Sequence, residues 1–118
     1  KVPVYRPELV ENFITIPKLP KGLHSAWAQY TLTAASNKQR DELQTALKQA
    51  GVPSMVYYPK PLHMQTAYKN FPNATGKGLP VCEDLASRVF SLPMHPYLED
   101  ETIKYISQSL ILAFKKAA

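Results

Sequence analysis

Residues 37–50 carry the clearest helical pattern in the chain. Their apolar positions recur at i, i+3, i+4 and i+7, and are Leu43, Ala46, Leu47 and Ala50. Ser36, followed three residues later by Gln39, is a capping-box signature for the start of a helix. Gly51 is a typical helix stop, and Pro53 forbids continuation. The pattern predicts an amphipathic helix that buries one face.

Two further helices are expected in the second half of the chain. One begins near Asp100, with an acidic first turn and a basic last turn that suit the helix dipole. Its buried stripe is expected to contain Ile103, Ile106, Leu110, Ala113 and Phe114. The other runs from Pro80, which suits a first helical turn, to about Arg88. Its apolar side is expected to contain Cys82, Leu85 and Val89.

The strand patterns are shorter. Residues 26–32 alternate with period 2. One side of this alternation is formed by Ala26, Ala28, Tyr30 and Leu32. Residues 13–16, 54–58 and 89–92 are briefer candidates, closed by prolines. The element order predicts an α+β fold, a two-layer arrangement in which a small, mostly antiparallel sheet packs against helices, as a single domain over residues 1–118.

Composition adds few constraints. The 118 residues are 45% hydrophobic and 19% charged, which is ordinary for a globular protein of one domain. No run of eighteen apolar residues occurs and the first residues do not resemble a signal peptide, so neither a membrane span nor a leader is expected. Cys82 is the single cysteine, which excludes an internal disulfide and a cysteine-based metal site. A cytoplasmic, reducing setting is expected.

The formal net charge of +5 has three interpretations. It could be a solvated surface, an attraction for an anionic small molecule, or a nucleic-acid-binding face. Proteins that bind a nucleic-acid backbone gather basic side chains along one face. Here the lysines are scattered, and the only adjacent pair is Lys115 and Lys116. This scatter favours a solvated surface, and no nucleic-acid partner is predicted.

One segment is chemically dense. Tyr57, Tyr58, Lys60 and His63 place two phenols, an ammonium and an imidazole in a short stretch that also contains two prolines. The prolines restrict the backbone, which suits the presentation of side chains to a ligand. Phenols can stack on a base or sugar and also hydrogen-bond, and a lysine can meet a phosphate. The alternative is a surface turn whose tyrosines are half buried in the core.

No complete catalytic constellation is found elsewhere. The three histidines lie far apart with no acidic partner at a fixed offset, so no metal site is predicted. Cys82 could act as a nucleophile with a distant histidine, but its place on the apolar side of a predicted helix favours packing. Trp27 could line a ligand, line a partner surface or pack under a helix, and we favour packing. The proline-bounded turn at residues 92–96 is expected to position the last helix.

Several short motifs follow one another in a fixed order between about residues 23 and 114. They are Ser25-Ala26-Trp27-Ala28-Gln29-Tyr30, Arg40-Asp41-Glu42-Leu43, Gly51-Val52-Pro53, Tyr57-Tyr58-Pro59-Lys60-Pro61-Leu62-His63 with Gln65 and Tyr68, Leu79-Pro80, and Leu92-Pro93-Met94-His95-Pro96. Each motif is weak alone. The ordered set resembles the C-terminal part of the DegT/DnrJ/EryC1/StrS aminotransferases.

The resemblance implies the small domain of a fold-type I aminotransferase. In that family a large N-terminal domain holds pyridoxal 5'-phosphate on a lysine, and the small domain closes the active site over a nucleotide-linked keto-sugar. The enzymes are homodimers with their sites at the subunit interface, and glutamate is the usual amino donor. The resemblance places Tyr57, Tyr58, Lys60 and His63 on the substrate side. Tyr57 stands where the family usually has a histidine.

The same resemblance implies that the cofactor-binding large domain is absent from this chain. A catalytic lysine needs a shielded site with its partners in place, and Lys60 in its proline-bounded turn has no such setting. No catalytic residue is therefore assigned, and the isolated chain is expected not to bind the cofactor or form a yellow lysine complex. Two alternatives are a free-standing module that binds a ligand or protein without catalysis, and a purely structural dimerisation domain, since fold alone does not separate these functions.

Overall fold

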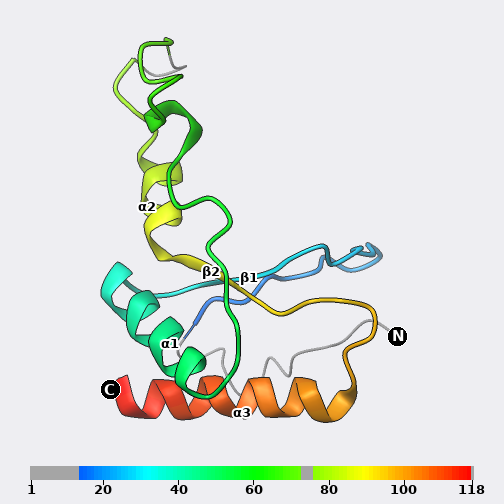
Figure 1. Ribbon diagram of the computed structural model, residues 1–118. Helices are drawn as coiled ribbons and strands as arrows, with labels where there is room; N and C mark the ends of the chain where they lie inside the picture. Colours follow the sequence, from blue (N-terminus) through cyan, green and yellow to red (C-terminus); the bar gives the residue numbers. More distant parts are fainter. Residues whose placement is uncertain (1–13, 73–75, 118) are drawn as a thin grey trace.

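The computed structural model describes residues 14–72 and 76–117 of the chain. The elements, in order, are β1 (Tyr30–Thr33), α1 (Asn37–Gln49), the short 3-10 helix η2 (Leu62–Met64), α2 (Pro80–Arg88), β2 (Val89–Leu92) and α3 (Asp100–Ala117). Helices α1 and α3 lie on one side of the strands (Figure 1). The two-layer α+β architecture predicted from the sequence is confirmed.

The sheet is small and antiparallel. β1 pairs with β2 in the register Tyr30 to Leu92 through Thr33 to Val89. A single bridge, Thr15 to Thr33, extends β1 on its outer edge, and another, Met55 to Ser91, extends β2. These bridges stand where the sequence predicted strands at residues 13–16 and 54–58. Both predictions were therefore too long, and Phe13 lies outside the described residues.

The strand predicted at residues 26–32 begins four residues late. Trp27 has a φ of 47°, in the left-handed region that a strand residue does not adopt. Its N–H donates to Ser25 Oγ at 3.1 Å, so this group is bonded locally and not to a neighbouring strand. The predicted alternation of buried and exposed side chains holds only where the chain joins the sheet. Tyr30 and Leu32 are buried there, whereas Ala26 and Ala28, before the strand, are exposed.

Helix α1 begins and ends as the sequence predicts. The Gln39 N–H donates to Ser36 Oγ at 3.1 Å, and Gln39 Oε1 accepts the Ala35 N–H at 2.7 Å. The Gln39 N–H is one of the groups that a helix start leaves without an internal partner, and the second bond holds the chain just before the N-cap Ser36. At the other end Gly51 has a φ of 73°, and the Val52 N–H returns to the Leu47 carbonyl at 2.9 Å. This is the Schellman arrangement expected of a glycine stop.

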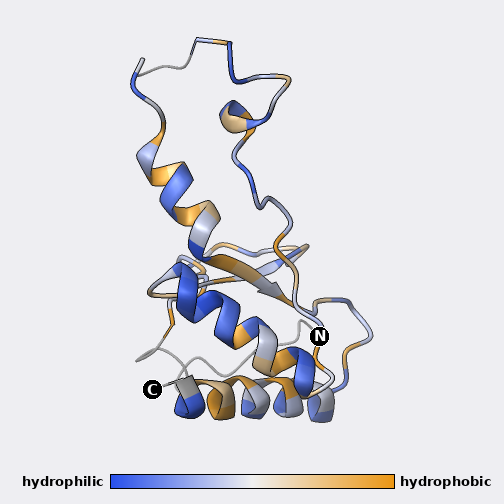
Figure 2. Ribbon diagram, turned by 60° about the vertical axis from the view of Figure 1, so that its left-hand side comes forward, coloured by the Kyte–Doolittle hydropathy of each residue, from blue (hydrophilic) through white to orange (hydrophobic). Residues whose placement is uncertain are grey.

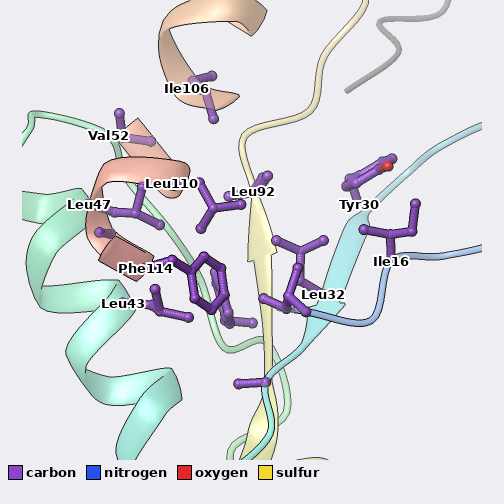
Figure 3. Close-up of a cluster of buried hydrophobic side chains, with 14 of the residues drawn as sticks. Ile16, Tyr30, Leu32, Leu43, Leu47, Val52, Leu92, Ile106, Leu110 and Phe114 are labelled. Carbon is purple, nitrogen blue, oxygen red and sulfur yellow. The ribbon is translucent and has the colours of Figure 1, made fainter. Parts of the chain in front are cut away.

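The hydrophobic core lies between α1, α3 and the sheet (Figure 3). Leu43 and Leu47 of α1 are fully buried, and the expected stripe of α3 is buried at every position. The core residues are Ile14, Ile16, Tyr30, Leu32, Ala34, Leu43, Leu47, Val52, Phe90, Leu92, Ile103, Ile106, Leu110, Ala113 and Phe114. Tyr105 Oη of α3 donates to the Ala50 carbonyl at 2.7 Å, which joins the two helices beside this core.

Residues 57–72 and 76–88 project from this layer, and we call them the arm. In Figure 1 the arm rises away from the sheet, with α2 as its returning half. Arg88 fixes its base, because the Ala34 N–H donates to the Arg88 carbonyl at 3.0 Å and Arg88 Nη1 donates to the Ala34 carbonyl at 2.8 Å. Asn37 Nδ2 adds a bond to the Ser87 carbonyl at 2.8 Å.

The arm corrects the prediction for the apolar side of α2. The helix has the predicted bounds, but Cys82 is exposed and Leu85 is 40% exposed, while Val89 already belongs to β2. The pattern predicts a core face because apolar side chains on one side of a helix usually pack inward. Here the helix points away from the core, and Figure 2 shows its hydrophobic positions alternating with hydrophilic ones along the arm.

Candidate ligand-binding segment on the arm

The candidate segment, residues 57–63, starts where the chain leaves the sheet. Just before it, Met55 exchanges two backbone hydrogen bonds with Ser91, at 3.0 and 2.7 Å. At its other end Pro61 opens η2, and its carbonyl accepts the Met64 N–H at 3.0 Å. The segment is thus attached to ordered structure at both ends, and its prolines limit the backbone between them.

Three of the four predicted site residues present unpaired polar groups. Tyr57 is 49% exposed, Tyr58 is 73% exposed and Lys60 is exposed. None of the three side chains bonds to another group within the part of the chain that the structure describes. Neither tyrosine belongs to the hydrophobic core, so the alternative of core-packed tyrosines is wrong. Their hydroxyl groups and the ammonium are available to a ligand or to a covering surface.

His63 has a different environment. Its side chain is only 17% exposed, and Nε2 lies 2.8 Å from Glu83 Oε1 on α2. The same carboxylate oxygen accepts the Leu79 N–H at 3.0 Å. The Leu79 N–H, and then the His63 ring, hold the pKa of Glu83 below its ordinary value. Glu83 is therefore an ionised acceptor at neutral pH.

Glu83 was not identified from the sequence. One of its partners, the His63 ring, is 20 residues away along the chain, and the other is the backbone N–H of Leu79. No side-chain motif in the sequence therefore marks Glu83. The one local signal is a glutamate in the first turn of a helix that begins at Pro80. The structure brings His63 to Glu83, but it forms no side-chain bond between His63 and Tyr57, Tyr58 or Lys60. These residues share only their segment.

The other candidates from the sequence have structural roles or none. Trp27 is half-buried, packs against the core and places its ring 5.2 Å from that of Tyr30, which confirms packing. The His95 carbonyl accepts the Leu98 N–H at 3.2 Å in the turn before α3. Cys82 is exposed, so its predicted packing is wrong. A shallow groove of about 510 Å³ lies between α1 and α3, and none of the four site residues lines it.

Lys60 does not have the surroundings of a lysine that holds pyridoxal phosphate. A site for this cofactor needs a shielded lysine, and the cofactor's ring nitrogen and phosphate also need partners. Lys60 is solvent-exposed in a turn, and no carboxylate within the described ranges bonds to it. No three His, Cys, Asp or Glu side chains gather into a metal site over residues 14–72 and 76–117. Over the same residues, no helix has the length and apolar content of a membrane span.

Comparison with known proteins identifies the family. The model of the DegT/DnrJ/EryC1/StrS aminotransferase family matches residues 2–111, and the chain belongs to this family. Its enzymes depend on pyridoxal phosphate. The chain also matches a crystal structure of a DegT DnrJ EryC1 StrS aminotransferase from Brucella abortus, with 44% identity and a TM-score of 0.83 over 92% of this chain and 28% of that one.

Two relatives with stated activities are similar over much of this chain. A UDP-N-acetyl-3-dehydro-alpha-D-glucosamine 3-aminotransferase from Acidithiobacillus ferrooxidans is 39% identical over 87% of this chain and 26% of its own. A UDP-2-acetamido-2-deoxy-3-oxo-D-glucuronate aminotransferase from Pseudomonas aeruginosa is 43% identical over 73% of this chain and 22% of its own. The chain therefore spans about a quarter of the length of these relatives. It corresponds to a portion of a sugar aminotransferase.

Proposed function

We propose that this chain is the C-terminal, substrate-closing part of a pyridoxal-phosphate-dependent aminotransferase that acts on a nucleotide-linked keto-sugar. The observation that carries the proposal is the segment at residues 57–63, which presents unpaired phenols and an ammonium on a backbone held at both ends. Two relatives named as aminotransferases of UDP-linked keto-sugars support the substrate class. The cofactor and the catalytic lysine belong to a large domain that this chain does not contain.

In this proposal each residue of the segment has its own task. The rings of Tyr57 and Tyr58 stack on the sugar or base, and their hydroxyl groups hydrogen-bond to it. Lys60 is a point charge for a phosphate of the nucleotide. His63 contributes a ring nitrogen from a less exposed position. The cofactor, held by the large domain, would supply the chemistry of amino transfer, while the segment orients the sugar and excludes water.

The exposed apolar side chains of the arm support a partner. Leu62, Phe71 and Val81 are 62%, 67% and 73% exposed, and they lie on three successive parts of the arm. Exposed apolar surface of this kind is typical of a face that another surface covers. We assign the cover to the large domain of the complete protein and to a second subunit of a homodimer. On this proposal, the isolated chain has no transaminase activity.

The experiment that tests the proposal is to extend the reading frame upstream of Lys1 and assay the encoded protein. We expect a large domain with a lysine that binds pyridoxal phosphate, and amino transfer from glutamate to a UDP-linked 3-keto-sugar. The 118-residue chain alone should give no turnover and no yellow complex with the cofactor. A reading frame without such a domain would refute the enzyme and favour a free-standing binding module.

Single substitutions in the complete enzyme test whether residues 57–63 contact the sugar nucleotide. Tyr58→Phe and Lys60→Ala should raise KM for the sugar nucleotide by about tenfold each, because each removes one polar contact to the substrate. Tyr97→Phe is the matched control, since Tyr97 is 86% exposed but lies in the turn before α3. Unchanged KM in both segment variants would remove the segment from the substrate site while leaving the family membership intact.

A further inference from the structure

Three parts of the arm meet at the carboxylate of Glu83. η2 contributes the His63 ring, whose Nε2 is 2.8 Å from Oε1, and the returning chain contributes the Leu79 N–H at 3.0 Å. The third part is α2 itself, which carries Glu83 in its first turn. One oxygen atom thus joins the outgoing half of the arm to its returning half. Among the described residues, the bond between His63 and Glu83 is the only hydrogen bond between side chains that joins η2 to α2.

Gly78 shows that the backbone is shaped around this carboxylate. Its φ is +91°, and a Cβ built on it would lie 3.1 Å from Glu83 Oε1, tighter than most real Cβ contacts. Gly76, two residues earlier, has a φ of +66° but would place a Cβ in open space. At both positions a residue with a side chain is disfavoured, because the φ angle is positive. Only Gly78 also provides the room in which the Glu83 carboxylate lies.

The contact requires a proton on Nε2 of His63. An ionised carboxylate only accepts hydrogen bonds, so Nε2 must be the donor to Glu83. In a neutral imidazole the other nitrogen, Nδ1, is then an acceptor. No described residue donates to Nδ1. A hydroxyl or amide N–H of a ligand would complete the hydrogen bonding of the ring.

We infer that Glu83 is a positioning residue, which holds the His63 imidazole with Nε2 protonated and Nδ1 presented as an acceptor to a hydroxyl or amide donor of the sugar. The identity of the donor rests on the proposed function. The proton on Nε2 and the bond between the two halves of the arm do not depend on the proposed function, because they follow from contacts inside this chain. Glu83 acts through His63 and contacts no substrate itself.

The first test is a ¹H–¹⁵N NMR spectrum of the 118-residue chain, whose core is built from its own residues. Histidine ring protons exchange with water too fast to detect unless a hydrogen bond protects them, so a visible Nε2–H signal, assigned by its loss in His63→Ala, is expected. Glu83→Ala should abolish the signal and lower protection of the Leu79 amide about tenfold. Glu83→Gln, whose amide oxygen still accepts, should retain the signal.

The two glycines provide a matched pair. Gly78→Ala should displace the carboxylate and weaken the His63 signal, whereas Gly76→Ala, with similar backbone strain and no contact, should not. Amide signals of Leu43 in the core report whether each variant is folded. The inference is overturned if the His63 signal is absent in the unmodified chain, persists in Glu83→Ala, or responds equally to both glycine variants.

The second test is kinetic and separates positioning of a ligand from simple stabilisation of the arm. In the complete enzyme, Glu83→Ala should raise KM for the sugar nucleotide about tenfold with a smaller change in kcat, and Glu83→Gln should restore it. An unchanged KM together with the expected NMR result would overturn the role toward the ligand. Absence of any sugar-nucleotide activity in the complete protein would instead refute the proposed function and leave the NMR result standing.

Discussion

The core layer and the arm are stabilised by different means. In the core layer, formed by β1, β2, α1 and α3, the large side chains with less than 2% exposure are all apolar. Their burial removes apolar surface from water, which is the dominant favourable term in folding. The described part of the arm contributes no residue to this core. Its contacts are mainly hydrogen bonds and ion pairs, with one pair of aromatic rings, Tyr68 and Phe71, at 6.1 Å, and most of its large apolar side chains are exposed.

The first turns of α1 and α2 show the same contrast on a local scale. α1 is capped from its own sequence, by Ser36 and Gln39. The N-cap residue of α2 is Leu79, whose side chain offers no cap, and the Leu79 N–H donates instead to Glu83, which also holds the distant His63. The start of α2 is therefore coupled to the other half of the arm. The core layer thus buries its apolar side chains within the chain, whereas the arm leaves most of its large ones exposed.

The largest predicted effect compares one phenylalanine from each region. Phe90 is 1% exposed in β2, and Phe90→Ala should lower the free energy of unfolding by about 3–5 kcal/mol through lost burial and a cavity. Phe71 in the arm is 67% exposed, and Phe71→Ala should change the free energy of unfolding by less than about 0.5 kcal/mol. Denaturant unfolding monitored by circular dichroism measures both. Equal losses would show that the arm shares the core's stability.

Trp27 tests the boundary of the core and should have an intermediate effect. Its ring is half-buried against the core and contacts Tyr30, but it is not enclosed. Trp27→Ala should therefore cost about 1–3 kcal/mol, the size of partial burial plus one aromatic pair. Unfolding in denaturant measures it, with Trp27→Phe as the control that keeps an aromatic ring. A loss below about 0.5 kcal/mol would place Trp27 outside the core.

The helices of this fold could be predicted because their signals are local. Ser36, Gln39 and Gly51 lie within or beside the helix that they delimit, and the apolar stripe of α3 spans the whole element. The strands were harder, because pairing depends on distant partners. Residues 54–58 have the composition of a strand but meet β2 at Met55 alone. Trp27 has a left-handed backbone conformation that its alternating neighbours do not reveal.

The candidate site was only half predictable for the same reason. Residues 57–63 stood out because their polar groups and prolines are adjacent in sequence. Glu83 did not, because its role depends on the fold of the arm, which brings α2 back to η2. The direction of α2 could not be predicted either, since an apolar stripe does not say whether that side of the helix packs against the core or is exposed. Cys82 and Leu85 were placed wrongly on that ground.

The cap of α1 should have a smaller effect than either aromatic residue. Ser36→Ala leaves the Gln39 N–H without its acceptor, and the free energy of unfolding should fall by about 1 kcal/mol. Ser36→Gly is the matched control and should cost only a few tenths of a kcal/mol, because glycine is tolerated at this position. Thermal unfolding of the three proteins measures the order. A larger loss from glycine would contradict the capping role.

The smallest effect is expected in acid and should be confined to the arm. The Leu79 N–H and His63 lower the pKa of Glu83, and a hydrogen bond from Arg88 lowers the pKa of Asp84. A carboxyl whose pKa is lower in the folded state stabilises that state above its unfolded pKa, and this contribution is lost as the pH falls through the folded pKa. Both groups lie on α2, whereas the buried polar residues of the core layer are serines, which do not titrate.

Lowering the pH below the ordinary carboxyl range of about 4 should therefore loosen the arm before the core layer. The Leu79 amide signal should shift toward its unfolded position while the Leu43 amide signal stays in place. Glu83→Gln removes the titrating group, so its Leu79 signal should lose most of this dependence on pH. If the two amides shift together in the unmodified chain, the arm and the core layer unfold as one unit, and the contrast between them would not extend to their stability.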